Sequence, residues 1–281
     1  MNQNRRDFIK AAAMLGAAAV TGRTSAQDTH AAPSPEAEIR IAHCGDPQFG
    51  FGPGGKDAYT RDLARFERLI ATINRMNPDI VVLGGDMTHV ANQVTRDWPR
   101  LLKLFKVPVL ATPGNHDLGI PMLGRRLERY RGVFGYDYKS IKVGKWRFIS
   151  GNTMYWHKTE EVEEKKKYEE WIAAELAKAK AAGEPVILCG HIPPFVSTVN
   201  EKDSYENHPK AGRAARLKMY LDNGVRYFLS GHTHRLIVRA YKGLTILNPE
   251  TTSRNFDELP YGFRLMTLRA NGGYSWDFHR V

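Results

Sequence analysis

The chain contains few cysteines, which excludes the class of small disulfide-rich proteins. Only two of its 281 residues are cysteine, too few for a fold built on disulfide bonds even in an oxidising compartment. Cys44 and Cys189 each lie two residues before a polar side chain at the end of an apolar run. We expect both to be buried thiols, with a disulfide between them as the alternative.

The chain also lacks an apolar run long enough to span a membrane, and its most apolar stretch lies near the start of the sequence. Ala11 to Val20 is apolar but is soon interrupted by a glycine and an arginine, whereas a spanning helix needs about 20 apolar residues. Paired arginines precede this run and small residues follow it, the pattern of a twin-arginine export signal. Residues 1–26 are therefore predicted to be a signal peptide used by the Tat export machinery. The mature protein is expected to be periplasmic or otherwise extracytoplasmic, and an uncleaved membrane tether stays open.

After the predicted signal peptide, the sequence indicates one linker and one domain, with no internal repeat. Residues 27–37 combine prolines with small and polar residues, which predicts a linker. Residues 38–281 are enough for one large domain with a continuous core. The net charge of +11 favours anionic substrates or surroundings, but basic and acidic residues are interleaved, and no basic-aromatic module predicts a dedicated nucleic-acid partner.

Short apolar segments alternate with amphipathic ones, which predicts an α/β fold. The late strands are separated by short turns, which favours a β-sandwich with helices outside over a simple doubly wound sheet. Strands are predicted at residues 39–44, 80–83, 107–111, 146–150, 186–189, 225–229, 236–241 and 263–269. Helices are predicted at residues 60–77, 96–106, 166–182 and 209–223.

Five short clusters of metal-binding side chains follow five of the predicted strands. In an open α/β sheet, binding and catalytic residues lie at the carboxyl ends of the buried strands. We therefore expect the five clusters to lie close together at that edge of the sheet. Mixed imidazole and carboxylate ligands suit Mn, Fe, Zn or Co better than Ca. The array predicts a site for two metal ions. The clusters are Asp46-Pro47-Gln48, Gly84-Gly85-Asp86, Gly114-Asn115-His116-Asp117, Gly190-His191 and Gly231-His232-Thr233-His234.

The five clusters, in this order, resemble the motifs of the calcineurin-like metallophosphoesterases. The likeness extends over residues 39–281. Gly45 to Gly50 and His191 to Phe195 are similar to a subgroup, the calcineurin-like phosphoesterase domain-containing proteins, some of which are described as serine/threonine-protein phosphatases. The resemblance implies a four-layer fold with a central β-sandwich flanked by helices. It also implies a phosphoric ester hydrolase with two divalent or trivalent ions of Mn, Fe, Zn or Co.

The resemblance further implies a role for each cluster. Asp86 would bridge the two ions and His116 would act beside the leaving group as general acid or transition-state stabiliser. Asp117 follows it and could orient that imidazole. The other ligands divide between the ions, His191, His232 and Asn115 at one and Asp46, Gln48 and His234 at the other.

Gln48 departs from the family pattern, which usually has histidine at this position. An amide oxygen is a weaker ligand than imidazole, so one ion is expected to bind less tightly or with a different metal preference. A mononuclear site and a purely structural Gln48 stay open as alternatives.

The expected reaction is hydrolysis of a phosphomonoester, including that of a phosphoprotein, by in-line attack of a metal-bridging hydroxide. One alternative is hydrolysis of phosphodiesters in nucleotides, lipids or envelope polymers. Another is a metal-dependent phosphate-binding protein with weak catalysis. Among the remaining residues, His43 is expected in the core and His89 near the pocket. Arg254 and the arginines at 125, 126, 129 and 131 are weaker candidates for phosphate contact.

Overall fold

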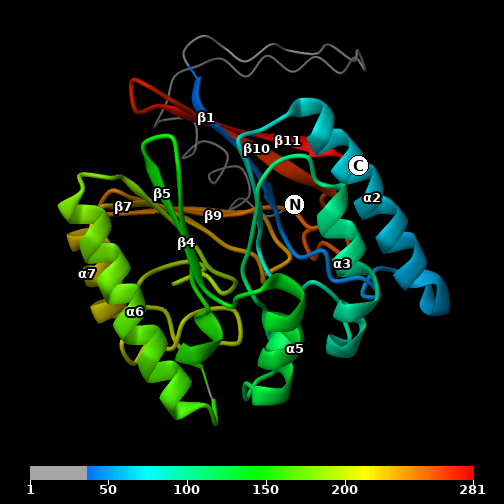
Figure 1. The fold of residues 1–281 in the computed structure, drawn as a ribbon, viewed down its shortest axis with the longest axis horizontal. Helices are drawn as coiled ribbons and strands as arrows, with labels where there is room; N and C mark the ends of the chain where they lie inside the picture. Colours follow the sequence, from blue (N-terminus) through cyan, green and yellow to red (C-terminus); the bar gives the residue numbers. More distant parts are fainter. Residues whose placement is uncertain (1–36, 158) are drawn as a thin grey trace, which may run out of the picture. The chain divides into compact units, whose positions relative to one another are not determined.

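The strands form two sheets that pack face to face and are covered by helices. The computed structural model describes residues 37–157 and 159–281, which all fall in the compact unit Ser34–Val281. The predicted signal peptide and nearly all of the predicted linker lie outside the described residues. In Figure 1, α2, α3 and α5 lie on one side of the two sheets and α6 and α7 on the other. The predicted four-layer α/β architecture is confirmed.

The first sheet has five strands in the order β11-β10-β1-β2-β3. β1, β2 and β3 are parallel, whereas β10 runs antiparallel to β1 and to β11. The three parallel carboxyl ends therefore emerge along one edge. The bounds are β1 (Ala37–Cys44), β2 (Ile80–Leu83), β3 (Val109–Ala111), β10 (Gly262–Arg269) and β11 (Tyr274–Arg280).

The second sheet has six strands in the order β4-β5-β6-β7-β9-β8. Its four central strands are parallel, with antiparallel strands at both edges. The bounds are β4 (Lys139–Val143), β5 (Trp146–Ser150), β6 (Val186–Cys189), β7 (Val225–Leu229), β8 (Ile237–Tyr241) and β9 (Leu244–Asn248).

Alternating side chains on the strands build two layers of core. Ile80 and Val82 of β2 point into the layer between the sheets, together with Ile187 of β6. Val81 of β2 and Leu188 of β6 point into the layer beneath the helices. Because successive residues of a strand face opposite sides, strands apolar throughout supply both layers at once.

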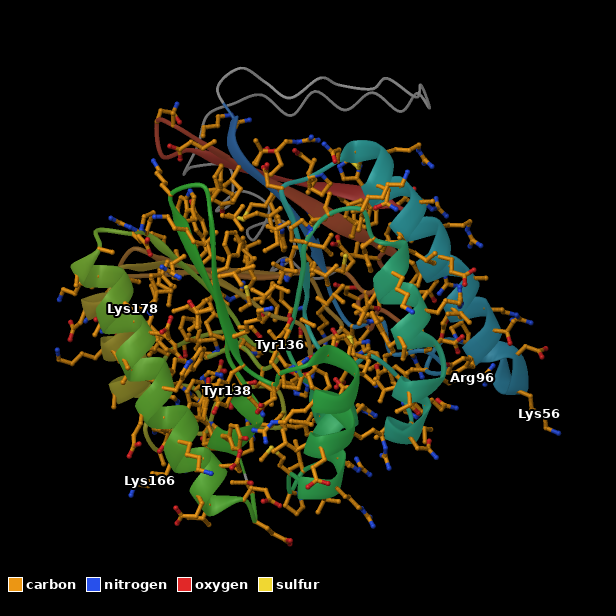
Figure 2. All side chains as sticks on the ribbon, in the orientation of Figure 1. Lys56, Arg96, Tyr136, Tyr138, Lys166 and Lys178 are labelled. Atoms are coloured by element: carbon orange, nitrogen blue, oxygen red, sulfur yellow. The ribbon has the colours of Figure 1, made fainter. Side chains whose placement is uncertain are left out.

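The helices cover the outer faces with apolar stripes. In α2, Phe66, Leu69, Ile70 and Ile73 are all buried at helical spacing, and each such side chain stabilises the fold by about 1.5–3 kcal/mol. Figure 2 shows charged side chains of α6 projecting outward. The helix bounds are α2 (Ala58–Met76), α3 (Val94–Leu104), α4 (Asn115–Leu118), α5 (Gly124–Phe134), α6 (Val162–Ala181) and α7 (Arg213–Asp222), with short 3₁₀ turns at Gly55–Asp57, Ala91–Gln93 and Thr153–Trp156.

The cysteines belong to different layers of the core. Cys44 packs beneath the helices and Cys189 between the sheets, and both are free and fully buried. The prediction of buried thiols is confirmed, and the disulfide alternative is wrong.

Candidate metal centre

The five polar clusters converge where the carboxyl ends of parallel strands from both sheets meet. Three clusters follow β1, β2 and β3, and two follow β6 and β7. Hydrogen bonds join the two sets: the backbone N–H of His232 donates to both carboxylate oxygens of Asp46, each at 2.9 Å. The convergence expected from the sequence is therefore present, and it involves both sheets.

The first group of candidate ligands comprises Asp86, His191 and His232, whose ligand atoms all lie within 4.8 Å of one another. His191 Nε2 lies 3.3 Å from Asp86 Oδ1 and 3.2 Å from His232 Nδ1. The side-chain oxygen of Asn115 joins them, 3.0 Å from His191 Nε2. All four side chains are buried.

Backbone carbonyls fix which nitrogen of each imidazole carries the proton. His191 Nδ1 lies 2.6 Å from the carbonyl oxygen of Gly84, and His232 Nε2 lies 2.7 Å from that of Tyr205. A carbonyl oxygen only accepts, so these nitrogens donate, and in neutral rings the lone pairs of His191 Nε2 and His232 Nδ1 face each other. A proton on one nitrogen or a metal ion between the two removes the repulsion between these lone pairs. The group therefore fits a metal ion.

The second group of candidate ligands comprises Asp46, Asp86 and His234, again with ligand atoms within 4.8 Å of one another. His234 Nδ1 donates to the carbonyl oxygen of Arg254 at 2.5 Å. Its Nε2 is left facing Asp46 Oδ1 at 3.9 Å. Asp86 belongs to both groups, so one carboxylate is placed to serve two ions.

Gln48 carries an unpaired side-chain oxygen, and its backbone N–H donates to the carbonyl oxygen of Asp86 at 2.7 Å. Its side chain is 1% exposed, and Oε1 has no hydrogen-bond partner among the described residues. Its Nε2 lies 3.5 Å from His89 Nδ1. An unpaired buried amide oxygen destabilises the folded chain by about 1–3 kcal/mol. A metal ion is one partner that would satisfy this atom, and Asp46, Asp86 and His234 supply a donor set that fits a second ion.

Backbone conformation brings these groups close together. Asp86, His232 and His234 all have positive φ, at 49°, 76° and 52°, a region that side chains other than glycine adopt at a cost. A Cβ on Gly114 would lie 2.1 Å from Asp86 Oδ1. Only glycine at 114 lets the two loops approach this closely.

The charged and titratable side chains of the site shift one another's pKa values. Burial opposes protonation of His191, but the carboxylates of Asp86 and Asp46 outweigh burial and raise the pKa of His191 to about 9. Burial, with His191 beside it, lowers the pKa of His232 to about 3. Burial would raise the pKa of Asp86, but His191 outweighs it and the pKa is lowered. A metal ion entering the site would displace the His191 proton.

His116 lies at the rim of the candidate centre and lines a cavity of about 480 Å³. Its Nδ1 is 2.9 Å from the carbonyl oxygen of His89, so Nδ1 donates, and the two imidazoles stack with centroids 4.9 Å apart. Its backbone N–H donates to Asp86 Oδ1 at 2.8 Å. The ring is thus held next to the candidate ligands, with Nε2 as the nitrogen not engaged by His89. His89 lines the same cavity, as expected.

Asp117 does not orient the His116 imidazole, so that part of the sequence prediction is wrong. Its carboxylate oxygens accept from the backbone N–H groups of Met87, at 3.0 Å, and Gly114, at 2.8 Å. Burial, reinforced by the charge of Asp86, raises the pKa of Asp117 to about 8. Asp117 instead ties the loop after β2 to the loop after β3.

Tyr205 is a site residue that the sequence did not single out. Its hydroxyl accepts from Asn115 Nδ2 at 2.6 Å and its carbonyl oxygen accepts from His232 Nε2. Its side chain is 59% exposed and lines the same cavity as His116. No local pattern marks Tyr205, because its contacts join loops far apart in the chain.

The side chains of His43, Arg131 and Arg254, which the sequence also singles out, contact residues outside the candidate metal centre. His43 is buried and bonds through Nε2 to the carbonyl oxygen of Ser230, as expected of a core residue. The Arg131 guanidinium pairs with carboxylates of neighbouring elements. Arg254 lies over the rings of Phe51 and Phe256.

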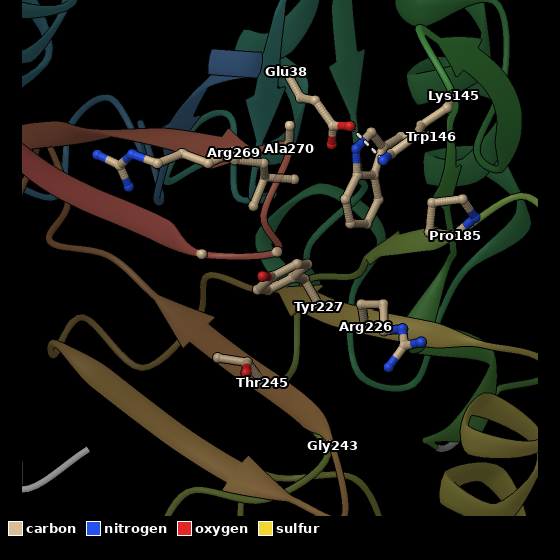
Figure 3. Close-up of a pocket in the computed structure, with 13 residues that line it drawn as sticks. Glu38, Lys145, Trp146, Pro185, Arg226, Tyr227, Gly243, Thr245, Arg269 and Ala270 are labelled. Atoms are coloured by element: carbon tan, nitrogen blue, oxygen red, sulfur yellow. Dashed lines mark ion pairs between the residues drawn. The ribbon is translucent and has the colours of Figure 1, made fainter. Parts of the chain in front are cut away.

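A second cavity lies at the opposite ends of the strands and is separate from this chemistry. It has a volume of about 450 Å³. Figure 3 shows Trp146 and Tyr227 on its walls and the ion pair of Lys145 with Glu38 at its edge. Its lining residues come from the amino ends of β1, β5, β7 and β9 and from the end of β10 with the turn that leads to β11. None of the candidate metal ligands lines it.

Comparisons with known proteins agree with this geometry. A family profile described as calcineurin-like phosphoesterase matches residues 39–236, and a profile for the twin-arginine translocation signal matches residues 2–22. Serine/threonine-protein phosphatase CPPED1 of Rattus norvegicus is 27% identical over 245 residues, covering 80% of this chain and 78% of that protein. A probable cyclic nucleotide phosphodiesterase of Vesicomyosocius okutanii is 27% identical over 213 residues, covering 73% of this chain and 84% of that protein.

Solved structures share the fold at low sequence identity. A dimetal phosphatase from Danio rerio superposes with a TM-score of 0.58 at 13% identity, covering 83% of this chain and 94% of that chain. GAP50 of Plasmodium, the anchor in the inner membrane complex, superposes with a TM-score of 0.59 at 15% identity, covering 86% and 84%. Within residues 37–157 and 159–281, no helix is long and apolar enough to cross a membrane. The chain, which carries a twin-arginine signal, belongs to the calcineurin-like phosphoesterases, a family of metal-dependent phosphoric ester hydrolases.

Proposed function

We propose that the protein hydrolyses a phosphomonoester, with phosphoproteins among its substrates, at a centre of two transition-metal ions. The observation that carries the proposal is the presence of Asp86 in both groups of candidate ligands. Two cations at short range repel, and a shared carboxylate offsets that repulsion. The residues proposed to hold the ions are Asp86 with His191, His232 and Asn115 on one side, and Asp86 with Asp46, Gln48 and His234 on the other.

The protein's own residues would position the substrate and move a proton. When bound, the ions would polarise the phosphate oxygens and lower the pKa of a water molecule. His191 and His232 keep their ligand nitrogens aimed at the centre because backbone carbonyls hold the opposite nitrogens. Protonated His116 would present Nε2–H to the departing oxygen while Nδ1 stays on the His89 carbonyl. No covalent enzyme intermediate is needed.

The names of relatives favour a phosphomonoester. Relatives that cover about four-fifths of this chain are named serine/threonine-protein phosphatases. The site also opens into a cavity on the His116 side, which can hold the leaving group of either ester class. Phosphodiester hydrolysis is a second candidate, favoured by the relative named a probable cyclic nucleotide phosphodiesterase.

Paired assays of the purified, metal-loaded protein test the proposal. We expect hydrolysis of 4-nitrophenyl phosphate in the presence of Mn or Fe, and loss of turnover in Asp86→Ala. Asp277→Ala removes an exposed carboxylate of β11 and should leave turnover unchanged. Faster hydrolysis of bis(4-nitrophenyl) phosphate would support the diesterase instead. Metal and phosphate binding without turnover of any substrate would indicate a binding protein, and equal turnover in Asp86→Ala would contradict the mechanism.

We further propose that the protein works outside the cytoplasm after export by the Tat machinery. The twin-arginine profile at residues 2–22 supports this location. Replacing Arg5 and Arg6 together with lysine should retain the protein in the cytoplasm, as measured by immunoblotting of cell fractions. An unchanged distribution would contradict Tat export, and recovery of unprocessed protein in membranes would indicate a tether.

A further inference from the structure

The cavity beside His116 is shaped by elements that also supply the candidate metal centre. Its volume is about 480 Å³, and His116 and Asn115 form the wall nearest the candidate ligands. Tyr205 and the segment that joins α4 to α5 form further walls. On the proposed function, this cavity lies on the leaving-group side of the scissile bond, because it is the side that His116 faces.

About half of the cavity wall is apolar, and one guanidinium lines it. Val90, Ile120 and Pro121 contribute apolar surface. Arg126, in the first turn of α5, is half-buried and also lines the cavity. No aspartate or glutamate among the described residues lines this cavity.

The Arg126 guanidinium has no partner within residues 37–157 and 159–281. Neither a hydrogen bond nor an ion pair of its side chain occurs there. On the same helix, the guanidinium of Arg131 pairs with both Asp137 and Glu164. A half-buried guanidinium without a counterion costs free energy in the folded protein, since burial removes part of its hydration.

Local backbone geometry accommodates this guanidinium. Gly119 has φ +93°, and a Cβ there would lie 3.4 Å from Arg126 Nη1. The same Cβ would lie 2.8 Å from the carbonyl oxygen of Pro121. Glycine at 119 therefore leaves space in which Arg126 lies along the cavity wall.

We propose that Arg126 binds an anionic group on the leaving group, so that preferred substrates are phosphomonoesters whose leaving alcohol carries a carboxylate or a second phosphoryl group. Guanidinium binds both groups through two parallel N–H donors. This inference rests on the proposed phosphomonoester hydrolysis and assigns the class of leaving group.

Three matched aryl phosphates test the inference. 3-Carboxyphenyl phosphate and 3-phosphonophenyl phosphate carry an anion, and 3-carbamoylphenyl phosphate is a neutral analogue of the first. In the metal-loaded protein, kcat/KM should be higher for the anionic esters than for the neutral one. Arg126→Gln should remove about 10- to 100-fold of kcat/KM for the anionic esters and change the neutral ester by less than about twofold. Comparison of the two anionic esters shows whether carboxylate or phosphoryl is preferred.

Two further variants separate recognition from folding. Arg125→Gln changes the exposed neighbour of Arg126 and should leave the anionic-to-neutral ratio unchanged. Arg126→Lys should restore part of that ratio because the charge remains. A ratio unaffected by Arg126→Gln, with all three esters still hydrolysed, would overturn this inference alone. Absence of hydrolysis of all three esters by the unaltered protein would overturn the proposed function and this inference with it.

Discussion

At the scale of single residues, Gln48 combines a departure from the family pattern with an unusual environment. Its Oε1 is buried and has no hydrogen-bond partner among the described residues, and its backbone N–H donates to the carbonyl oxygen of Asp86 at 2.7 Å. The backbone contact fixes the loop whatever the side chain is. The side chain is therefore available to determine how tightly one ion binds.

We expect Gln48→Ala to bind only one tightly held metal ion and Gln48→His to bind the second ion about tenfold or more tightly than the unaltered protein. Metal content per chain after dialysis against buffers of defined Mn concentration measures both. Gln93→Ala is the matched control, because Gln93 Oε1 is also buried and unpaired but belongs to the 3₁₀ turn Ala91–Gln93 and not to one of the five metal-binding clusters. Two tightly bound ions in Gln48→Ala would show that Gln48 is structural.

His43 provides a residue-scale prediction of pH dependence. Burial lowers the pKa of His43 to about 3, and Arg264 also disfavours its protonation. Below pH 6.5 the unfolded chain takes up a proton that the folded chain does not, so stability falls as the pH drops toward the folded pKa. Between pH 7 and pH 5 this histidine should lower the unfolding free energy by about 2 kcal/mol.

Urea unfolding of the metal-free protein at pH 5, 6 and 7 measures the His43 effect. His43→Leu should reduce the decline in unfolding free energy by roughly that amount. Ile41→Val alters a buried neighbour on β1 without a titratable group and should leave the decline intact. An identical pH profile in His43→Leu would contradict the assignment.

The candidate ligands could be predicted from the sequence because each follows an apolar strand at its carboxyl end. The contacts that hold these ligands in place could not be predicted from the sequence. His116 is held by the backbone carbonyl of His89 rather than by Asp117, and a carbonyl acceptor has no signature in side-chain type. Tyr205 reaches Asn115 across 90 positions, a contact that depends on the path of its loop.

At the scale of elements, the loop that carries Tyr205 is organised by one carboxylate. Glu201 accepts hydrogen bonds from the hydroxyl of Ser197, from the backbone N–H groups of Val196, Ser197 and Thr198, and from the side chain of Asn207. Burial alone would raise the pKa of Glu201, but these hydrogen bonds outweigh it and lower the pKa to about 2. Glu201 thus ties both ends of the loop together.

Glu201→Ala should open this loop without unfolding the sheets. Loss of these charge-assisted hydrogen bonds should lower the local opening free energy by about 2 kcal/mol, and amides of residues 196–208 should exchange about 30-fold faster. Hydrogen-deuterium exchange measures this change. Glu206→Ala removes only an ion pair with Arg235 and should affect exchange far less. Unchanged protection in Glu201→Ala would refute the role of Glu201.

Predictability also differed between elements. The buried parallel strands are predictable because they are runs of apolar residues. The edge strands β4 and β11 are not among the predicted strands, since most of their residues are exposed or polar. β9 was missed because only Lys242 and Gly243 separate it from β8, although positive φ at both residues makes a tight hairpin.

At the scale of the whole molecule, the candidate centre draws ligands from both sheets. Asp46 and Asp86 follow strands of the first sheet, and His191 and His234 follow strands of the second. Ions bound there would link the sheets in the folded protein and have no equivalent site in the unfolded chain. Metal binding should therefore stabilise the entire domain.

Chelation should lower the Tm by about 5–10 °C, which corresponds to roughly 2.7 kcal/mol for an ion present at 100 times its Kd. Thermal unfolding with a chelator, and again after metal is restored, measures the shift. Asp86→Ala should show a much smaller difference between the two conditions. A Tm that does not respond to metal in the unaltered protein would contradict a centre shared by the sheets.

Because the two thiols lie in different core layers, their reactivity can be used to follow the unfolding of the domain. Burial raises the pKa of both sulfhydryls, and one sits beneath the outer helices whereas the other sits between the sheets. An alkylating reagent can reach either sulfur only after its own layer has loosened. The rate at which each thiol is alkylated therefore reports how fast its own core layer opens. The order in which Cys44 and Cys189 become modified would show whether the helices detach before the two sheets separate.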